Sequence, residues 1–401
     1  MPAGPLYAQP HQFEPLLPRA EVREGLLAKA HDLQLQGLRT GGRAHHSVMD
    51  AISPLLRAVN SYYTNKIEGQ HTLPREVEAA LNNDYSPDAD VRRRQRLALA
   101  HMQTERWAEQ NFESTPWREL FAPDVIAALH RHLFAQLPEE ERRLKDGTVM
   151  EPGAFRLKDV AVGRHLAPAA ASVPAFLQRM HEVYSGVREG ELAVVAVACA
   201  HHRLAWVHPF ADGNGRIARL HSHLLLYRMG LTGGVWSPLR GLARSHARYD
   251  ERLDGADAPR EGDLDGRGNL SERQLVAFCD YFLDICIDQA RFMRDMLDLD
   301  RVQERIRACL SFESTRADSA IKLEAEHPLY LMFVSGQLER GVFKRMTGLP
   351  ARTAERLLSG LLNRGLVVSP TPKGKLGFGI PLDALRFYFP RLWPEAEADV
   401  G

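Results

Sequence analysis

Residues 208–219 read HPFADGNGRIAR, and an apolar run from 192 to 207 leads into them. That run is long enough for a buried helix. Pro209 cannot continue a helix, so the helix is expected to end near His208 and to leave the imidazole facing a loop. Histidine is the side chain best suited to accept a proton near neutral pH. The stretch therefore predicts a buried helix that delivers a base to a loop.

A glycine-rich turn follows this histidine. Glycine adopts positive φ at little cost, so the turn at Gly213, Asn214 and Gly215 can point successive backbone N–H groups at one anion. Residues 217–227 read as a helix whose N-terminus faces the same place, and helix N-termini favour phosphate. The sequence thus predicts a phosphate-binding turn.

Three charged side chains flank the turn. Arg216 and Arg219 lie about one helical turn apart, and guanidinium groups suit phosphate oxygens. Asp212 offers the hard oxygen that Mg²⁺ on a nucleotide requires. A lone His-Pro pair is usually structural and a lone Gly-x-Gly is usually a turn. Their combination at this spacing favours acid–base chemistry beside bound phosphates.

The stretch resembles the signature of the Fic family, H-[PF]-F-x-[DE]-G-N-G-R-x-x-R, and it matches every specified position. The resemblance implies a protein adenylyltransferase, which transfers AMP from ATP to a Ser, Thr or Tyr hydroxyl of a target protein with Mg²⁺. It implies that His208 deprotonates the hydroxyl and that Asp212 holds Mg²⁺ between the α- and β-phosphates. The resemblance also implies that Arg216 contacts the leaving pyrophosphate and that Arg219 contacts the γ-phosphate. The phosphates would further be bound by the backbone amides of Gly213, Asn214 and Gly215.

A second motif, TNKIEG, occupies residues 64–69. It closes a segment of helical periodicity, and Gly69 is a natural helix C-cap. Alone, it reads as the end of an amphipathic helix with a solvated glutamate. Beside a Fic signature it resembles the autoinhibitory motif [ST]-x-x-x-E-[GN], whose fixed positions are Thr64, Glu68 and Gly69. The resemblance implies that Glu68 pairs with Arg219, removes the partner of the γ-phosphate and places negative charge there.

Residues 153–163 read GAFRLKDVAVG and contain a short alternating run that predicts a β-hairpin. A plain surface hairpin is one interpretation. The segment also resembles the Fic flap, G-x-[FY]-R-x-x-x-V-x-[VI]-G, which holds a target segment by strand addition. That resemblance implies that Val162, Gly163, Arg164 and His165 overlie the nucleotide.

Two further nucleotide contacts are implied by the family likeness. Residues 245–250, SHARYD, precede a helical stretch at the place where the family has an aromatic near the adenine. This assigns Tyr249 to the base, although a lone tyrosine on a helix more often packs in a core. Asp257 is a weaker candidate for the same region.

Composition excludes several classes of protein. The chain has 401 residues, 44% of them hydrophobic and 25% charged, as in soluble globular proteins of roughly two or three domains. The formal net charge is zero, so nothing global points to nucleic acid. No apolar span is long enough for a membrane helix, and residues 1–10 lack the regions of a signal peptide. The four cysteines lie in apolar contexts without metal spacing, which predicts reduced core residues and a cytoplasmic protein.

The expected fold class is mainly α: a Fic-type helical core with a short β-hairpin flap, followed by a C-terminal winged-helix domain. We expect residues 1–110 to carry the inhibitory helix, residues 111–300 to form the catalytic core, and residues 301–401 to form a helical linker and a winged helix-turn-helix. Helices are expected near residues 20–38, 44–68, 88–110, 117–135, 172–207, 214–229, 271–297 and 300–314.

The C-terminal expectation rests on the order of elements after residue 325. Helices are predicted at 328–334, 341–348 and 351–365, and strands at 366–368 and 376–378, an order that resembles the winged module ending many Fic proteins. Residues 327–401 carry ten Lys and Arg against six Asp and Glu. Arg352, Arg356, Lys373 and Lys375 are compatible with DNA phosphates. Winged helices also dock proteins or dimerise, and a protein interface is favoured over DNA contact.

Alternatives stay open at this point. The same site could transfer another nucleotide or a phosphoryl group, or remove AMP, in which Glu68 would take part. A DNA-binding regulator with a nucleotide-sensing Fic core is the rival from another class, but it would need decay at His208, Asp212 or the glycines, and the sequence shows none. The expected partners are a target protein, with self-modification and a homodimer as further family expectations.

Overall fold

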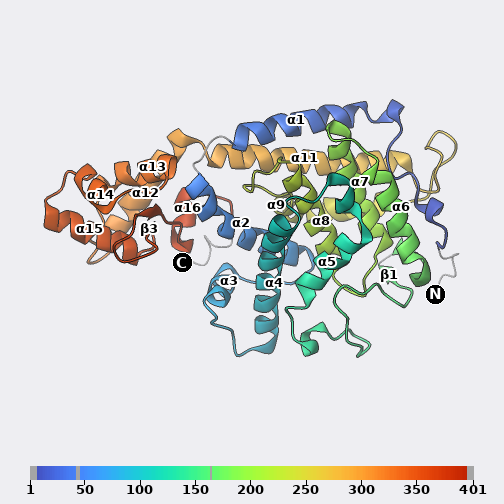
Figure 1. Cartoon of the computed structure of the whole chain (residues 1–401), viewed down its shortest axis with the longest axis horizontal. Coiled ribbons are helices and arrows are strands. Elements are labelled where there is room, and N and C mark those ends of the chain that lie inside the picture. Colours follow the sequence, from blue (N-terminus) through green and yellow to red (C-terminus); the bar gives the residue numbers. More distant parts are fainter. Residues whose placement is uncertain (1–6, 42–45, 163–164, 395–401) are drawn as a thin grey trace.

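The computed structural model describes residues 7–41, 46–162 and 165–394, and these ranges are mainly helical (Figure 1). The helices before the C-terminal module are α1 (Glu24–Gly41), α2 (His46–Ile67), α3 (Pro74–Leu81), α4 (Ala89–Asn111), α5 (Pro123–Phe134), α6 (Val173–Ser185), α7 (Glu191–Val207), α8 (Asn214–Arg228), α9 (Leu239–Arg244), α10 (His246–Ala256), α11 (Glu272–Met296) and α12 (Leu299–Ser314). Short 3₁₀ helices include η3 (Trp117–Phe121) and η4 (Glu139–Arg142). Mainly α architecture is therefore confirmed.

Helix α7 lies at the centre of the core. Its residues from Val194 to Ala200 are all fully buried, as expected of a helix that is apolar on every side. It contacts α1, α6, α8 and α11, and α1 lies along α11 over one side of the molecule (Figure 1). This packing fixes the end of α7, from which the predicted site begins.

The expected single helix over residues 172–207 is wrong, because the structure has two helices there. Helix α6 ends at Ser185 and α7 begins at Glu191. Gly190 between them has a φ of 133°, which a right-handed helix cannot accommodate. Nothing in the sequence indicated α3 either, which is only eight residues long and starts at Pro74.

The predicted hairpin exists, but it lies later in the chain than the alternating run indicated. Strand β1 (Ala161–Val162) pairs antiparallel with β2 (His165–Leu166), with Ala161 opposite Leu166. The preceding segment is not a strand, because the backbone N–H of Arg156 donates to the carbonyl of Pro209 instead, at 2.9 Å. Gly163 and Arg164 lie outside the described residues.

The elements after residue 325 follow the expected order. They are α13 (Glu326–Ser335), α14 (Arg340–Met346), α15 (Ala351–Asn363), β3 (Val367–Val368), β4 (Gly377–Phe378) and α16 (Leu385–Tyr388). Strands β3 and β4 pair antiparallel, and Leu338 bridges Leu376 beside them. In Figure 1 this module, coloured orange to red, forms one end of the molecule.

The structure bears on the cysteines and on the apolar length of the helices, which were both considered from composition. Cys199, Cys279, Cys286 and Cys309 are all buried and unpaired by disulfides. Within the described ranges, no helix combines the length and apolar character needed to span a membrane.

Candidate functional site

His208 leaves the end of α7 in an unusual backbone conformation. Its φ and ψ are 49° and 59°, the left-handed region that a non-glycine residue adopts only when its surroundings impose it. Arg156 supplies part of that constraint, since its Nε donates to the His208 carbonyl at 2.8 Å and its backbone N–H binds Pro209. The helix therefore stops at His208, as the sequence predicts, and the side chain leaves the helix axis.

The imidazole of His208 is kept neutral by its surroundings. Burial lowers its pKa to about 4, and the neighbouring His165 and Arg156 act in the same direction, whereas Glu68 opposes them. A neutral imidazole at pH 7 can accept a proton without first losing one. The position and the protonation state both suit a general base.

The loop after His208 is held by side chains on both sides. Asn214 forms a pair of hydrogen bonds with Phe210, accepting from its N–H at 2.8 Å and donating to its carbonyl at 2.9 Å. His130 of α5 stacks on Phe210 with ring centroids 3.9 Å apart, and its Nε2 lies 3.2 Å from the Asp212 carbonyl oxygen. Sequence reasoning missed His130, because a lone histidine inside a helix carries no pattern.

Gly213 is the N-cap residue of α8 and has no room for a side chain. Its φ is 80°, and a Cβ would lie 2.4 Å from the ring of Phe134. Its N–H donates to Oδ1 of Asp212 at 2.7 Å. The Asp212 carboxylate is itself exposed, so a hard oxygen is presented at the N-terminus of α8, which fits a Mg²⁺ ligand.

Arg216 and Arg219 are buried on the first two turns of α8, each 2% exposed. Arg216 donates from Nε to the side-chain oxygen of Asn65 at 3.0 Å. Among the described residues, its Nη2 has no hydrogen-bond acceptor. A buried guanidinium with a spare donor is well suited to an anion such as phosphate.

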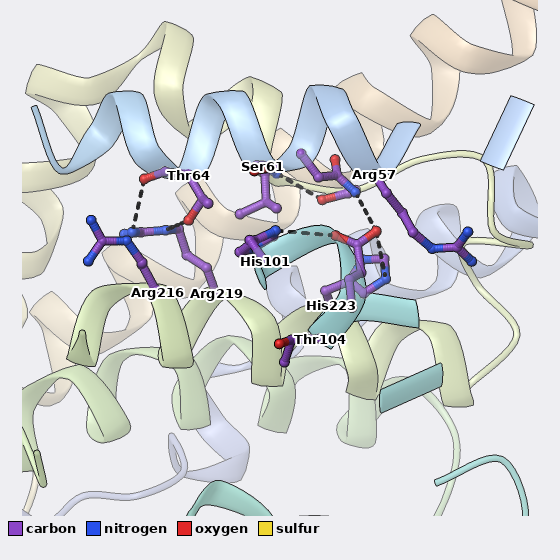
Figure 2. A network of polar contacts seen from close by, with 12 residues as sticks. Arg57, Ser61, Thr64, His101, Thr104, Arg216, Arg219 and His223 are labelled. Carbon is purple, nitrogen blue, oxygen red and sulfur yellow. Dashed lines mark hydrogen bonds and ion pairs between the residues drawn. The ribbon is translucent and has the colours of Figure 1, made fainter. Parts of the chain in front are cut away.

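Arg219 is engaged by the end of α2, as Figure 2 shows for Thr64. Its Nε donates to Oγ1 of Thr64 at 2.8 Å, and its Nη2 lies 2.5 Å from Oε1 of Glu68. Gly69 follows with a φ of 70° and ends the helix. Gly215 leaves the space for this contact, because a Cβ there would lie 2.5 Å from Oε1 of Glu68.

The charge balance favours an ionised Glu68. Burial acts to raise its pKa, but the charges of Arg219 and Arg216 outweigh burial and lower it. The cavity lined by Asp212 and Arg216 measures only about 20 Å³. Ligand pockets usually have several hundred Å³. In this structure Glu68 occupies the guanidinium of Arg219, to which the sequence assigns the γ-phosphate.

The flap is tied to the end of α7 by His165. Its Nε2 lies 2.7 Å from the Trp206 carbonyl oxygen, and its Nδ1 lies 3.3 Å from Oδ2 of Asp257. Asp257 also pairs with Nε2 of His202 at 3.1 Å. Asp257 and His165 are thus brought together, and Val162 lies in the paired strand.

Tyr249, which the family likeness assigns to the adenine, lies in the core of this structure. Tyr249 is 2% exposed, and its hydroxyl lies 2.7 Å from Nε2 of His201 in the core. Burial raises its pKa to about 12. Tyr249 packs beside His201, and its contact with an adenine stays a prediction.

Comparison with known proteins identifies part of the chain. The Fic/DOC family matches residues 120–226. Protein adenylyltransferase Fic of Drosophila mojavensis is 38% identical over 82 residues, which is 20% of this chain and 16% of that protein. The Drosophila melanogaster protein of the same name is also 38% identical over 82 residues and is covered to 17%. The chain therefore spans about a sixth of the length of these curated relatives.

A solved structure extends the likeness to the fold. A Fic family protein from Desulfovibrio desulfuricans G20 aligns with a TM-score of 0.50 and 17% sequence identity, covering 92% of this chain and 99% of that one. Helices α5 to α8, which position His208, Asp212 and Arg219, lie largely within the matched residues 120–226. The chain contains a Fic domain.

Proposed function

We propose that this protein transfers AMP from ATP to a hydroxyl group of a target protein, and that Glu68 restrains the reaction. The proposal is supported by the arrangement of residues 208–219 and by the name, protein adenylyltransferase Fic, of the relatives that match this region. The observation that carries it is the 2.5 Å contact between Glu68 and Arg219, because it connects both sequence motifs in one site.

The transfer step uses the geometry around His208. The neutral imidazole accepts the proton of a Ser, Thr or Tyr hydroxyl, whose oxygen attacks the α-phosphorus of ATP. The bond from that phosphorus to the bridging oxygen breaks, and pyrophosphate leaves. Asp212 would hold Mg²⁺, which neutralises phosphate charge when bound. Catalysis of this kind consists mainly of positioning and electrostatic stabilisation.

The phosphates would occupy the N-terminus of α8. The first N–H groups of that helix have no carbonyl acceptor within it, and Arg216 has a spare Nη2 donor among the described residues. Arg219 would bind the γ-phosphate once Glu68 moves away. Since Glu68 and a phosphate compete for the same guanidinium, the inhibited and active states exclude each other.

Labelling with ATP carrying an α-phosphate label and Mg²⁺ tests this proposal. We expect Glu68→Gly to incorporate about 10- to 100-fold more label into protein than the unaltered chain, since a charge-assisted hydrogen bond contributes roughly 1.5–3 kcal/mol. The double variant Glu68→Gly/His208→Ala should incorporate none. Label on the chain itself would show self-modification; adding cell lysate tests other targets.

Two results would count against the proposal. Equal labelling of the unaltered chain and Glu68→Gly would remove the inhibitory role. Label from the γ-position or from UTP, with none from the α-position of ATP, would replace AMP transfer by another transfer at the same site.

For the C-terminal module we propose a winged helix that docks protein. The order of α13, α14, α15, β3 and β4 supports the winged helix. A cavity of about 690 Å³ beside α15 is lined by Arg352, Arg356 and the loop after α12, and its volume lies in the usual range of ligand pockets. DNA binding that weakens steeply with salt would contradict the docking role.

A further inference from the structure

A second polar layer lies one helical turn away from the contact of Thr64 with Arg219. Four residues before Thr64 on α2 is Asn60, and four residues after Arg219 on α8 is His223. Helix α4 faces both with Glu105 and Glu109, again four residues apart, so all these side chains share one interior space. Figure 2 shows this layer on the side of Arg57 and His223.

Three potential metal ligands meet in this layer. Nε2 of His223 lies 2.9 Å from Oε1 of Glu109 and 3.7 Å from Oε1 of Glu105. One ligand atom from each residue lies within 4.8 Å of the others. In a tetrahedral site with bonds of about 2.0–2.2 Å, neighbouring ligand atoms are about 3.3–3.6 Å apart. The observed separations lie on either side of that value, so small side-chain movements would produce it.

These residues are deeply buried. Glu105, Glu109 and His223 are 2%, 7% and 3% exposed. Arg57 binds the outer oxygen of Glu109 at 2.6 Å, and Asn60 donates to Oε1 of Glu105 at 2.9 Å. Within the described part of the chain, Oε2 of Glu105 has no hydrogen-bond partner, and Nδ1 of His101 lies 3.9 Å from it. A buried carboxylate oxygen without a hydrogen bond is costly, so this carboxyl group has capacity for a further ligand.

A small cavity adjoins the three residues. It measures about 10 Å³ and is lined by Glu105, Glu109, His223, Asn60 and Arg57 among others. That volume holds about one water molecule or ion. The cavity therefore has room for one water molecule beside the three side chains.

We propose that Glu105, Glu109 and His223 bind one divalent transition-metal ion, with a water in the cavity as a further ligand. Two carboxylates and one imidazole form a donor set that suits Zn²⁺, Mn²⁺ or Co²⁺. The charge of the ion balances both carboxylates. Arg57 stays on the outer oxygen of Glu109, in the way that ligating carboxylates are commonly hydrogen-bonded from outside.

Such an ion would join α2 to the rest of the core. Arg57 and Asn60 reach the ligands from α2, Glu105 and Glu109 come from α4, and His223 comes from α8. Metal binding would therefore strengthen the packing of the helix whose last turns hold Arg219. The site itself does not depend on any transfer activity, so it can be tested separately.

Titration of the full chain with Co²⁺ in excess Mg²⁺ tests the site, after prior treatment with a chelator. We expect one Co²⁺ per chain by equilibrium dialysis and the visible absorption of low-coordinate Co²⁺. Glu105→Gln and His223→Gln should each weaken binding by about 100-fold or more, since even outer partners of ligands cost 10- to 100-fold. Asp90→Asn, on the exposed first turn of the same helix, is the matched control and should bind normally.

Asp212→Asn separates this site from the proposed Mg²⁺ position. Binding that survives Glu105→Gln and His223→Gln but is lost in Asp212→Asn would overturn the proposal, as would absence of Co²⁺ binding to the unaltered chain. Zn²⁺ should also raise the thermal unfolding midpoint of the unaltered chain but not that of Glu105→Gln. An equal rise in both would place the ion elsewhere, even if His223→Gln does not fold.

Discussion

Gly213 shows how a missing side chain shapes the site. Its φ of 80° is unfavourable for residues other than glycine. A side chain is also excluded by the Phe134 ring, which lies 2.4 Å from the position that a Cβ would take. Gly147 provides a comparison, since its φ is 83° but nothing lies within 4 Å of such a Cβ. The two glycines thus share the backbone cost of substitution and differ in the steric one.

We expect Gly213→Ala to lower the free energy of unfolding by about 2–4 kcal/mol and Gly147→Ala by only about 1 kcal/mol. Urea denaturation of both variants measures the difference. Equal losses would mean that the Phe134 ring moves aside freely. If the double variant Gly213→Ala/Phe134→Leu regains part of the lost free energy of unfolding, the steric clash is with the Phe134 ring.

His208 leads to a prediction about pH. Because burial lowers its pKa to about 4, the imidazole is neutral above that pH and protonated below it. A base works only when neutral, so the transfer rate of Glu68→Gly should stay level from about pH 8 to about pH 5 and fall toward pH 4. A rate profile with its midpoint near 6.5 would show that the imidazole is solvated in the active state.

The sequence predicts which residues belong to the site better than it predicts how deeply each side chain is buried. His208, Asp212 and Arg219 could be named because a fixed spacing places them on a helix end, a turn and a first helical turn. Tyr249 was assigned to the adenine on its place along the chain alone, and that place gave no sign of its burial against His201. His130 had no signal, since its role depends on Phe210, which is distant in sequence.

At the scale of elements, Arg156 connects the flap with the end of α7. Its guanidinium donates to the carbonyls of His208, Lys158 and Pro168, and it is 4% exposed. Three carbonyls on two segments are held by one planar group, which lysine cannot replace. The segment from Lys158 to Pro168 and the backbone of His208 are therefore positioned together.

We expect Arg156→Lys in the Glu68→Gly background to reduce the transfer rate by about 100-fold, because a small misplacement of catalytic groups costs that much. Lys158→Ala is the control, since Lys158 is exposed and pairs with Asp146. Hydrogen exchange should rise at residues 161–166 in Arg156→Lys alone. A lower rate with unchanged exchange would argue against a positioning role.

The same arginine explains why the flap strands were predicted too early. Alternation along residues 153–163 indicated a strand, but the backbone of Arg156 pairs with Pro209, and that contact depends on the tertiary fold. The long helices α4, α8 and α11 were predicted within a few residues, because their apolar periodicity is local. The break before α7 was missed, since an apolar run does not reveal where Gly190 turns the chain.

For the whole molecule, the end of the chain packs against the helix that carries Thr64. Trp393 is 3% exposed, and its ring lies 5.7 Å from that of Tyr62 on α2. Arg240 of α9 fixes this segment by donating to the carbonyl of Arg391 at 2.7 Å. The C-terminal module and the proposed inhibitory contact therefore share α2.

Loss of Trp393 should loosen α2 and so release Arg219 from Glu68. We expect Trp393→Ala to raise AMP labelling several-fold in the unaltered background and to add nothing to Glu68→Gly, where the contact is already absent. A buried Trp→Ala change costs about 3–5 kcal/mol, so labelling is measured well below the unfolding temperature. Trp117→Ala, which removes a partly buried ring that packs on Phe121, is the control, and the unfolding midpoints of both variants are measured so that their losses of stability can be compared.

The combination of variants decides between a specific and a general effect. If Trp117→Ala raises labelling as much as Trp393→Ala, general destabilisation frees the site and α2 has no special part. If Trp393→Ala raises labelling further in Glu68→Gly, the C-terminal segment acts on the site by a route other than Glu68. Only an effect confined to Trp393→Ala and dependent on Glu68 means that a partner bound at the C-terminal module could control Arg219 through α2.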